Sequence, residues 1–333
     1  MILPIAVLSL LLAVWKLEDV LPNRDAKIDI LSIVLSTIGF GGLLYGFSTA
    51  SSAGWSAIEV WGTIAAGAIG LAWFIVRQFN LEQPLLDLRI YTYPSYALAS
   101  VVSMVLSVAM FSGMILTPAY VQNVRGIEPF EAGLMMLPGA IMMGIMSPIT
   151  GKLFDRFGPR ILAVIGLTIT TLATVGLGYL DVDSSYLYII SVYTIRMFGI
   201  SMVMMPIMTN GLNALPNRLN PHGTAMNNTA QQVAGAIGTA VLVTVFNSHT
   251  KTRAAEITAD LKANASSAAQ PTAEQIAQIQ AQVMQQAMLD GITFSFYVAA
   301  AVTLVALVLA LFIKRVDVTK REDYTGPVPL KNK

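Results

Sequence analysis

The sequence has no cysteine and only two histidines, His222 and His249, among its 333 residues. Disulfides, thiolate metal sites and cysteine nucleophiles are therefore excluded, and two histidines so far apart in sequence do not indicate a metal site. Charged residues make up only 12% of the chain, whereas about a quarter of a typical soluble domain is charged. The formal net charge is +1, so nucleic acid is not an expected partner. The composition excludes an ordinary water-soluble domain.

What the chain does contain is long apolar runs, and 55% of its residues are hydrophobic. A helix needs about 20 apolar residues to cross a bilayer core roughly 30 Å thick. Barrel strands are excluded because these runs do not alternate between apolar and polar residues. The expected fold class is an all-α polytopic membrane protein in contact with the lipid bilayer. Its eight spans are predicted at 30–50, 57–76, 96–119, 132–150, 161–180, 186–208, 224–246 and 292–313.

Residues 1–14 are also apolar, but they are too few for a complete span. A signal peptide would start with basic residues and end at a small-residue cleavage site, whereas here the basic residues follow the apolar stretch. We interpret 1–14 as the end of a truncated spanning helix, which would make the chain a piece of a longer protein. A short re-entrant or interfacial segment is the alternative.

The positions of Lys and Arg predict the orientation, because loops on the cytoplasmic side are enriched in them. With 15–29 placed in the cytoplasm, 15 of the 20 Lys and Arg residues fall on that side. The chain then divides into two central helices (30–76), a cytoplasmic connector (77–95), a six-helix domain (96–313) and a cytoplasmic tail (314–333). A multi-pass protein with a cytoplasmic C-terminus is expected.

One polar segment, 248–290, interrupts the six-helix domain on the outer side. Ile276, Ile279 and Val283 recur in it at helical spacing. We expect two short helices outside the membrane that extend the flanking spans, with a disordered loop as the alternative.

The most specific pattern lies in the predicted cytoplasmic loop 151–160. Glycines there would allow two helices to meet in a tight turn, and an acid beside basic residues can form an ion pair. A cationic loop alone is expected from topology. The spacing of five residues makes this loop more specific than a cationic loop in general. These residues are Gly151, Asp155, Arg156, Gly158 and Arg160.

With this spacing the loop resembles the signature loop of the major facilitator superfamily. Residues 132–139 resemble the drug:proton antiporter branch with 14 spanning helices, of the EmrB/QacA type and LmrB-like. Residues 84–88 are similar to that family's connector before its ninth helix, and 232–238 to its thirteenth helix. The resemblance implies the C-terminal portion of such a transporter: a six-helix bundle preceded by two extra helices and a partial helix.

The resemblance also implies a function, which is proton-coupled multidrug efflux by alternating access in a bacterial cytoplasmic membrane. Hydrophobic or cationic small-molecule drugs would be the substrates, a missing N-terminal half the partner, and the proton gradient the energy source, with no cofactor. An enzyme is not expected, because the spans lack a convergent set of catalytic groups. A single-metabolite exporter and a non-functional truncated fragment are the alternatives.

By the same resemblance, Asp155 and Arg156 would act as a conformational latch. They would hold the cytoplasmic ends of helices together in one state of the transport cycle. A purely topogenic role is the alternative.

Arg196 is the charge predicted to lie nearest the bilayer midplane, in span 186–208. Insertion scales assign such a charge a cost of at least about 2.5 kcal/mol, and it normally faces the bundle interior or a cavity. Arg196 would either line the transport pathway or act as a structural pin bonded to backbone carbonyls or amide side chains.

Other polar residues are candidates for the transport pathway because amides can bond to drugs or to neighbouring helices. Residues 228, 231 and 232 share a helical face, and helix packing is the alternative role for the amides of span 224–246. Asn210 could belong to a cytoplasmic vestibule, with an ordinary polar helix end as the alternative. Glu131 could assist proton exchange, with a solvated helix-start carboxylate as the alternative. Some of the clustered methionines, Met204 among them, could line an apolar drug site or face lipid. The candidates are Asn210, Asn227, Asn228, Gln231, Gln232 and Glu131.

Overall fold

The computed structural model describes residues 29–81, 84–264 and 273–317, together with residues 7, 10–12 and 15, which are helical. The rest of the predicted partial helix 1–14, most of loop 15–29 and the tail from 318 onward lie outside the described residues. So do 82–83 and the predicted break at 265–272.

Eight helices within the described residues are long and apolar enough to cross a membrane. This confirms the all-α membrane class, because a backbone in lipid must satisfy its own hydrogen bonds. Short turns of 3₁₀-helix lie at Leu88–Thr92 (η1) and Asn217–Leu219 (η3), and a π-helical turn (η2) spans Tyr120–Val124. The helices are α2 (Ile30–Ala53), α3 (Ile58–Asn80), α4 (Pro94–Ala119), α5 (Pro129–Phe157), α6 (Pro159–Leu177), α7 (Tyr186–Asn213), α8 (Asn220–Asn264) and α9 (Ala273–Ala310).

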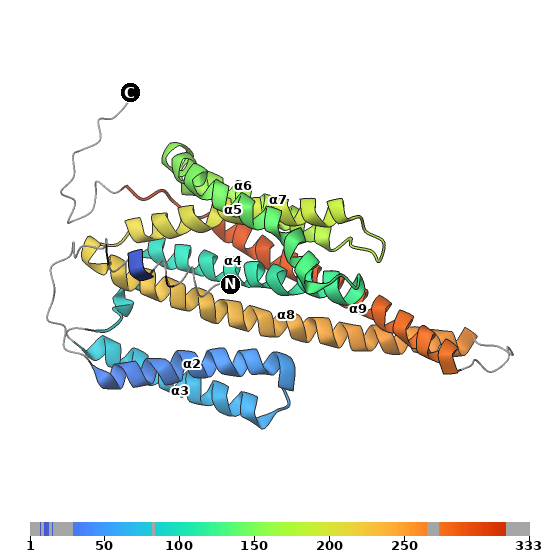
Figure 1. The fold of residues 1–333 in the computed structure, drawn as a ribbon. Coiled ribbons are helices and arrows are strands. Elements are labelled where there is room, and N and C mark those ends of the chain that lie inside the picture. The colour runs from blue at the N-terminus through green and yellow to red at the C-terminus, as the bar shows by residue number, and fades with distance from the viewer. Residues whose placement is uncertain are drawn as a thin grey trace.

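The helices run roughly parallel or antiparallel, and α4, α8 and α9 lie between the pair α2–α3 and the group formed by α5, α6 and α7 (Figure 1). The hairpin α2–α3 lies along one side of α8, and α2 makes the contact. Helices α5, α6 and α7 lie on the opposite side, with α7 packed against both of the others and α6 also packed against α9. Helix α4 contacts α7, α8 and α9 and is half buried in its most apolar stretch.

The main core lies where α4, α6, α7 and α9 meet, around Val102, Leu167, Ile200 and Ala306. A second cluster, which includes Tyr120 and Phe296, fills the end at which η2 and the loop after α6 lie. Many large apolar side chains stay exposed, such as Trp73 at 57%. In water this would be a liability, but lipid-facing helices require it.

Close packing of α2 on α3 depends on glycines. A Cβ atom added at Gly42 would lie 2.9 Å from Cα of Gly67, and one added at Gly67 would lie 2.6 Å from the backbone nitrogen of Leu43. Small residues at such a contact let two backbones approach in a membrane, where apolar burial alone does not drive association.

The prediction of a ten-residue loop at 151–160 is wrong. Helix α5 continues to Phe157 and α6 begins at Pro159, so Gly158 alone separates them, with φ of +79°. Polarity marks where a chain leaves the hydrocarbon, but a helix ends only where its backbone is broken. Here the left-handed conformation of Gly158 breaks it, and Pro159 restarts a helix at its first position.

The polar segment 248–290 holds no separate short helices among its described residues. Instead α8 continues from its span to Asn264, and α9 begins at Ala273 and runs into its own span. The two helices contact each other and extend beyond the bundle as a hairpin (Figure 1). The predicted extension of the flanking spans is therefore what the structure contains.

Candidate functional site

The strongest candidate site lies where α4, α7 and α8 converge. Helix α4 contacts both of the others, whereas α7 and α8 contact each other at few places. A cavity of about 10 Å³, the room that one water needs, lies there. We call it the α4/α7/α8 cavity, and it is lined by Ser103, Leu106, Ser107 and Met110 of α4, Met204 of α7 and Gln231 of α8.

Gln231 and the hydroxyl of Ser103 are the polar groups in this cavity that have no side-chain hydrogen bond among the described residues. The Ser107 hydroxyl already donates to the carbonyl oxygen of Ser103, at 2.9 Å. The half-buried Gln231 amide has no hydrogen-bond partner among the residues that the structure describes. Met110 and Met204 supply flexible apolar surface beside it. One unpaired amide among thioethers suits an apolar molecule with a polar group, because such sites combine apolar walls with few polar contacts.

The other amides at the start of α8 are placed differently from Gln231. Asn227 is buried, at 3% exposure, and its Nδ2 has no partner within the described part of the chain. Asn228 and Gln232 are exposed. One helical turn further on, Gly235 packs against Phe111 of α4. This side of α8 therefore faces α4, and of the predicted face only Gln231 reaches the cavity.

Arg196 is fully buried between α4, α6 and α7. Its Nε donates to Oγ1 of Thr174 at 3.1 Å, and its Nη2 donates to the carbonyl oxygen of Ala109 and to Ser112. Its Nη1 has no partner in the described part of the chain. A carbonyl and hydroxyls of neighbouring helices therefore hold the guanidinium.

The residues of the predicted latch lie at the end of the bundle where α5 gives way to α6. Asp155 and Arg156 are exposed, and the Arg156 guanidinium lies 5.3 Å from the ring centre of Phe157. The Asp155 backbone oxygen accepts a hydrogen bond from Nη2 of Arg315 at 3.0 Å. Its carboxylate has no ion-pair partner among the described residues. Gly151 lies in α5, and Arg160 is exposed in the first turn of α6.

Glu131 and Asn210 lie away from the α4/α7/α8 cavity. Glu131 is exposed in the first turn of α5, as expected for a carboxylate at a helix start. Asn210 is buried near the end of α7. Its Nδ2 donates to the backbone oxygen of Lys314, and its Oδ1 accepts from the backbone nitrogen of Val316, both at 3.1 Å. Asn210 therefore connects α7 to the segment that follows α9.

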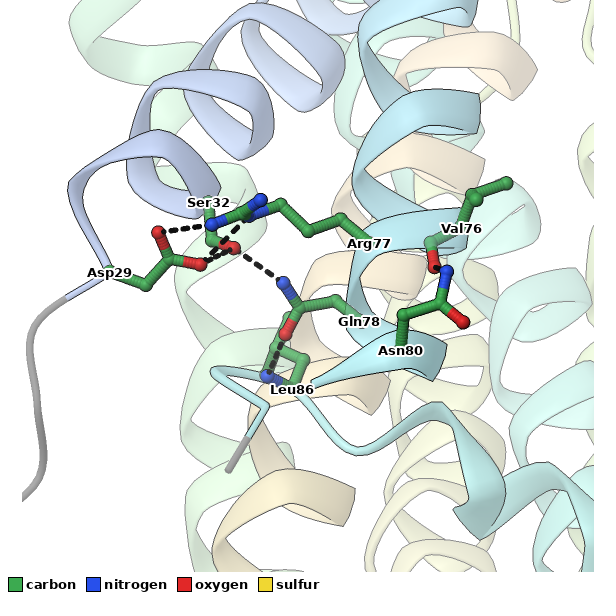
Figure 2. Close-up of polar contacts among 7 residues, drawn as sticks. All are labelled: Asp29, Ser32, Val76, Arg77, Gln78, Asn80 and Leu86. Carbon is green, nitrogen blue, oxygen red and sulfur yellow. Dashed lines mark hydrogen bonds and ion pairs between the residues drawn. The ribbon is translucent and has the colours of Figure 1, made fainter. Parts of the chain in front are cut away.

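Sequence reasoning missed a polar cluster where α2 begins and α3 ends (Figure 2). Arg77 donates to both carboxylate oxygens of Asp29, at 2.9 and 3.1 Å. Ser32 donates to Asp29 at 2.6 Å and accepts from the buried Gln78, whose Oε1 accepts from the backbone nitrogen of Leu86. Arg77 and Ser32 hold the pKa of Asp29 below its usual range. The sequence did contain a signal for this cluster, because the acidic Asp29 precedes the first predicted span and the basic Arg77 follows the second.

Comparison with known proteins identifies the family and the relatives of this chain. The family model described as Major Facilitator Superfamily matches residues 4–239. Three proteins of Bacillus subtilis are similar over most of the chain: the uncharacterized MFS-type transporter YhcA (43% identity over 77% of this chain), the uncharacterized MFS-type transporter YcnB (40% over 94%) and the lincomycin resistance protein LmrB (39% over 95%). The matched parts span 48%, 61% and 63% of those relatives' lengths.

Proposed function

This chain belongs to the major facilitator superfamily, and on that premise we propose that it is part of a proton-coupled multidrug efflux transporter that works by alternating access. Hydrophobic or cationic small-molecule drugs would be its substrates. The multi-pass chain would lie in a bacterial cytoplasmic membrane, with the C-terminus in the cytoplasm. Helices α4–α9 would form the six-helix domain of the 14-helix type, and α2 and α3 the two central helices.

The observation that carries this proposal is the α4/α7/α8 cavity. It combines an unpaired amide, Gln231, with the thioethers of Met110 and Met204. Such a surface can adapt to ligands of different shape, as promiscuous sites do. A cavity of about 10 Å³ is far too small for a drug. We therefore propose that it widens in another state of the cycle, in which a second set of helices completes the site.

The end of α5 supports a latch in that cycle. The exposed Asp155 carboxylate has no ion-pair partner among the described residues, while Arg315 holds the backbone beside it. A carboxylate that is unpaired in one state can pair in another, which is the property that a bistable ionic contact requires.

Export of ethidium, a hydrophobic fluorescent cation, tests the function. Cells that express the complete gene should accumulate less ethidium than cells without it, and a protonophore should abolish the difference. Gln231→Ala should weaken export, because it removes the amide from the proposed path. Gln278→Ala is the matched control, since Gln278 is exposed on α9 outside the predicted spans.

Each outcome decides one part of the proposal. Equal ethidium levels with and without the gene, repeated across a panel of drugs, would overturn the efflux function. Export that survives the protonophore would overturn proton coupling. Export of a single compound only would favour a metabolite exporter, and a Gln231→Ala variant with normal export would remove the cavity from the path.

A further inference from the structure

A larger cavity lies at the other side of the bundle, where α6 begins and α9 has ended. We call it the α6/α9 cavity. Its volume is about 640 Å³, well within the range of small-molecule sites. Its walls include the cations Arg160, Lys314 and Arg315 and the apolar side chains of Phe157, Ile161 and Leu311.

The charge of this cavity has one sign. Arg160, Lys314 and Arg315 line it, and no acidic residue of the described chain does so. Nη2 of Arg315 donates to the backbone oxygen of Asp155, which positions the guanidinium. An arginine has five N–H donors, so four of them remain for a ligand once this bond is counted. The walls of the cavity therefore hold three cations, one of which is positioned by a backbone contact, and no acidic side chain.

The apolar walls of the α6/α9 cavity are open to the surroundings of the bundle. Phe157 is 46% exposed, Ile161 49% and Leu311 43%. These side chains continue the exposed apolar surface of α6, where Ile165 is 45% exposed. A cationic site therefore adjoins a surface that would face hydrocarbon. A ligand that satisfies both parts has an anionic head and an apolar tail.

We propose that the α6/α9 cavity binds the headgroup of an anionic phospholipid from the cytoplasmic leaflet. The phosphate would lie among Arg160, Lys314 and Arg315, and the acyl chains would lie along Ile161 and Leu311. Basic pockets between spanning helices on the cytoplasmic side are suited to such headgroups, and that leaflet carries anionic lipid. The choice of the cytoplasmic leaflet rests on the orientation in the proposed function. The charge and shape of the site are independent of that orientation.

Bound lipid would connect elements that are far apart in the sequence. Arg160 follows Gly158, the one residue between α5 and α6, whereas Lys314 and Arg315 follow α9. A phosphate shared by these three cations would hold the α5–α6 turn against the end of α9. The lipid would therefore stabilise this end of the bundle.

Native mass spectrometry of the purified full chain tests the site. The protein in detergent is titrated with phosphatidylglycerol or, separately, with phosphatidylcholine of the same acyl chains. Tight binding is expected for phosphatidylglycerol only. Changing Arg160, Lys314 and Arg315 to Gln should weaken it roughly fivefold for each cation and about a hundredfold for all three.

The matched control variant changes Lys152, Arg89 and Arg218 to Gln. These cations are exposed at the same end of the bundle and do not line the cavity. Phosphatidylglycerol binding should be unchanged in this variant, and both triple variants should elute as monodisperse protein. An equal loss in both variants would mean attraction to overall charge and would overturn the proposal.

Two further outcomes would also overturn it. Equal binding of the two lipids would exclude recognition of the anionic head. Displacement of phosphatidylglycerol by millimolar inorganic phosphate would identify a site for free phosphate instead of lipid. The measurement needs no transport, so a protein that binds the lipid but exports no drug would refute the proposed function alone. A protein that exports drug without lipid selectivity would refute this inference alone.

Discussion

The guanidinium of Arg196 in α7 lies against Gly113 of α4, in the space that the Cβ atom of any larger residue would occupy. Arg196 is fully buried, and it donates to a carbonyl of α4 and a hydroxyl of α6. The missing side chain at position 113 is therefore what lets a buried cation reach the backbone of a neighbouring helix. This contact joins three helices of the main core.

Substituting Gly113 by Ala should destabilise the protein. The added methyl group would overlap with Nη1 and Cζ of Arg196, and overpacking of this kind costs about 1–3 kcal/mol. The apparent unfolding temperature in detergent, followed by tryptophan fluorescence, should fall. Gly133→Ala is the control, because nothing lies within 4 Å of a Cβ atom at that exposed position, and it should be neutral or slightly stabilising.

A double-mutant cycle identifies the cause of that loss. In an Arg196→Met background, Gly113→Ala should cost much less than in the native protein, because the overlapping guanidinium is gone. An unchanged cost in that background would show that Gly113 is required for some other reason.

The orientation can be tested directly because the chain has no cysteine of its own. We expect Lys152→Cys to react with a membrane-impermeant maleimide only after the cells are opened. Thr258→Cys, near the far end of the α8–α9 hairpin, should react in intact cells. Both positions are on helices outside the predicted spans. The reverse pattern would contradict the cytoplasmic placement of the α5–α6 turn.

The Asp29–Arg77 pair predicts how stability depends on acid. Arg77 lowers the pKa of Asp29 in the folded protein, whereas an unfolded aspartate has a pKa of about 3.9. The pair therefore contributes stability that is fully present above about pH 4 and is lost as the pH falls through the folded value. Asp29→Asn should lower the unfolding temperature at pH 7 and should flatten its decline between pH 5 and pH 3.

The control for this experiment is Asp183→Asn, a substitution of an exposed aspartate at the other end of the bundle. It should change neither the unfolding temperature at pH 7 nor its decline in acid. If Asp29→Asn behaves like this control, the ion pair contributes nothing measurable.

Gly158 should tolerate no other residue without strain. Its φ of +79° and ψ of 171° define a conformation that essentially only glycine adopts, and holding a residue with a Cβ atom there costs about 1–3 kcal/mol. Gly158→Ala should lower the unfolding temperature. Gly144→Ala, at an open position inside α5, should leave it unchanged or raise it. Equal effects of the two substitutions would refute a special role for the α5–α6 turn.

The α5–α6 turn shows where sequence reasoning reached its limit. The charges of 151–160 predicted a loop between two spans, whereas α5 continues through this stretch to Phe157. Hydropathy reports which solvent a residue prefers, while helix length also depends on where the backbone is forced to turn. The same reason explains why 248–290 continues the helices α8 and α9.

The amides of α8 show a second limit. Helical periodicity placed 228, 231 and 232 on one face, but only Gln231 lines the α4/α7/α8 cavity. Which part of a face meets a neighbour depends on how closely the helices pack. On α8 the contacts of Gly235 with Phe111 and of Gly238 with Val108 set that packing.

The eight apolar helices could be recognised from the amino-acid sequence alone, because hydrocarbon requires each spanning segment to be long, apolar and internally hydrogen-bonded. The hydrogen-bond partners of the buried Arg196 could not be recognised from the sequence. Arg196, Thr174 and Ala109 are on three different helices, and nothing local to any of them specifies the others. Only the packing of α4, α6 and α7 brings a carbonyl and a hydroxyl within reach of one guanidinium, because side-chain contacts between helices depend on their relative position and rotation.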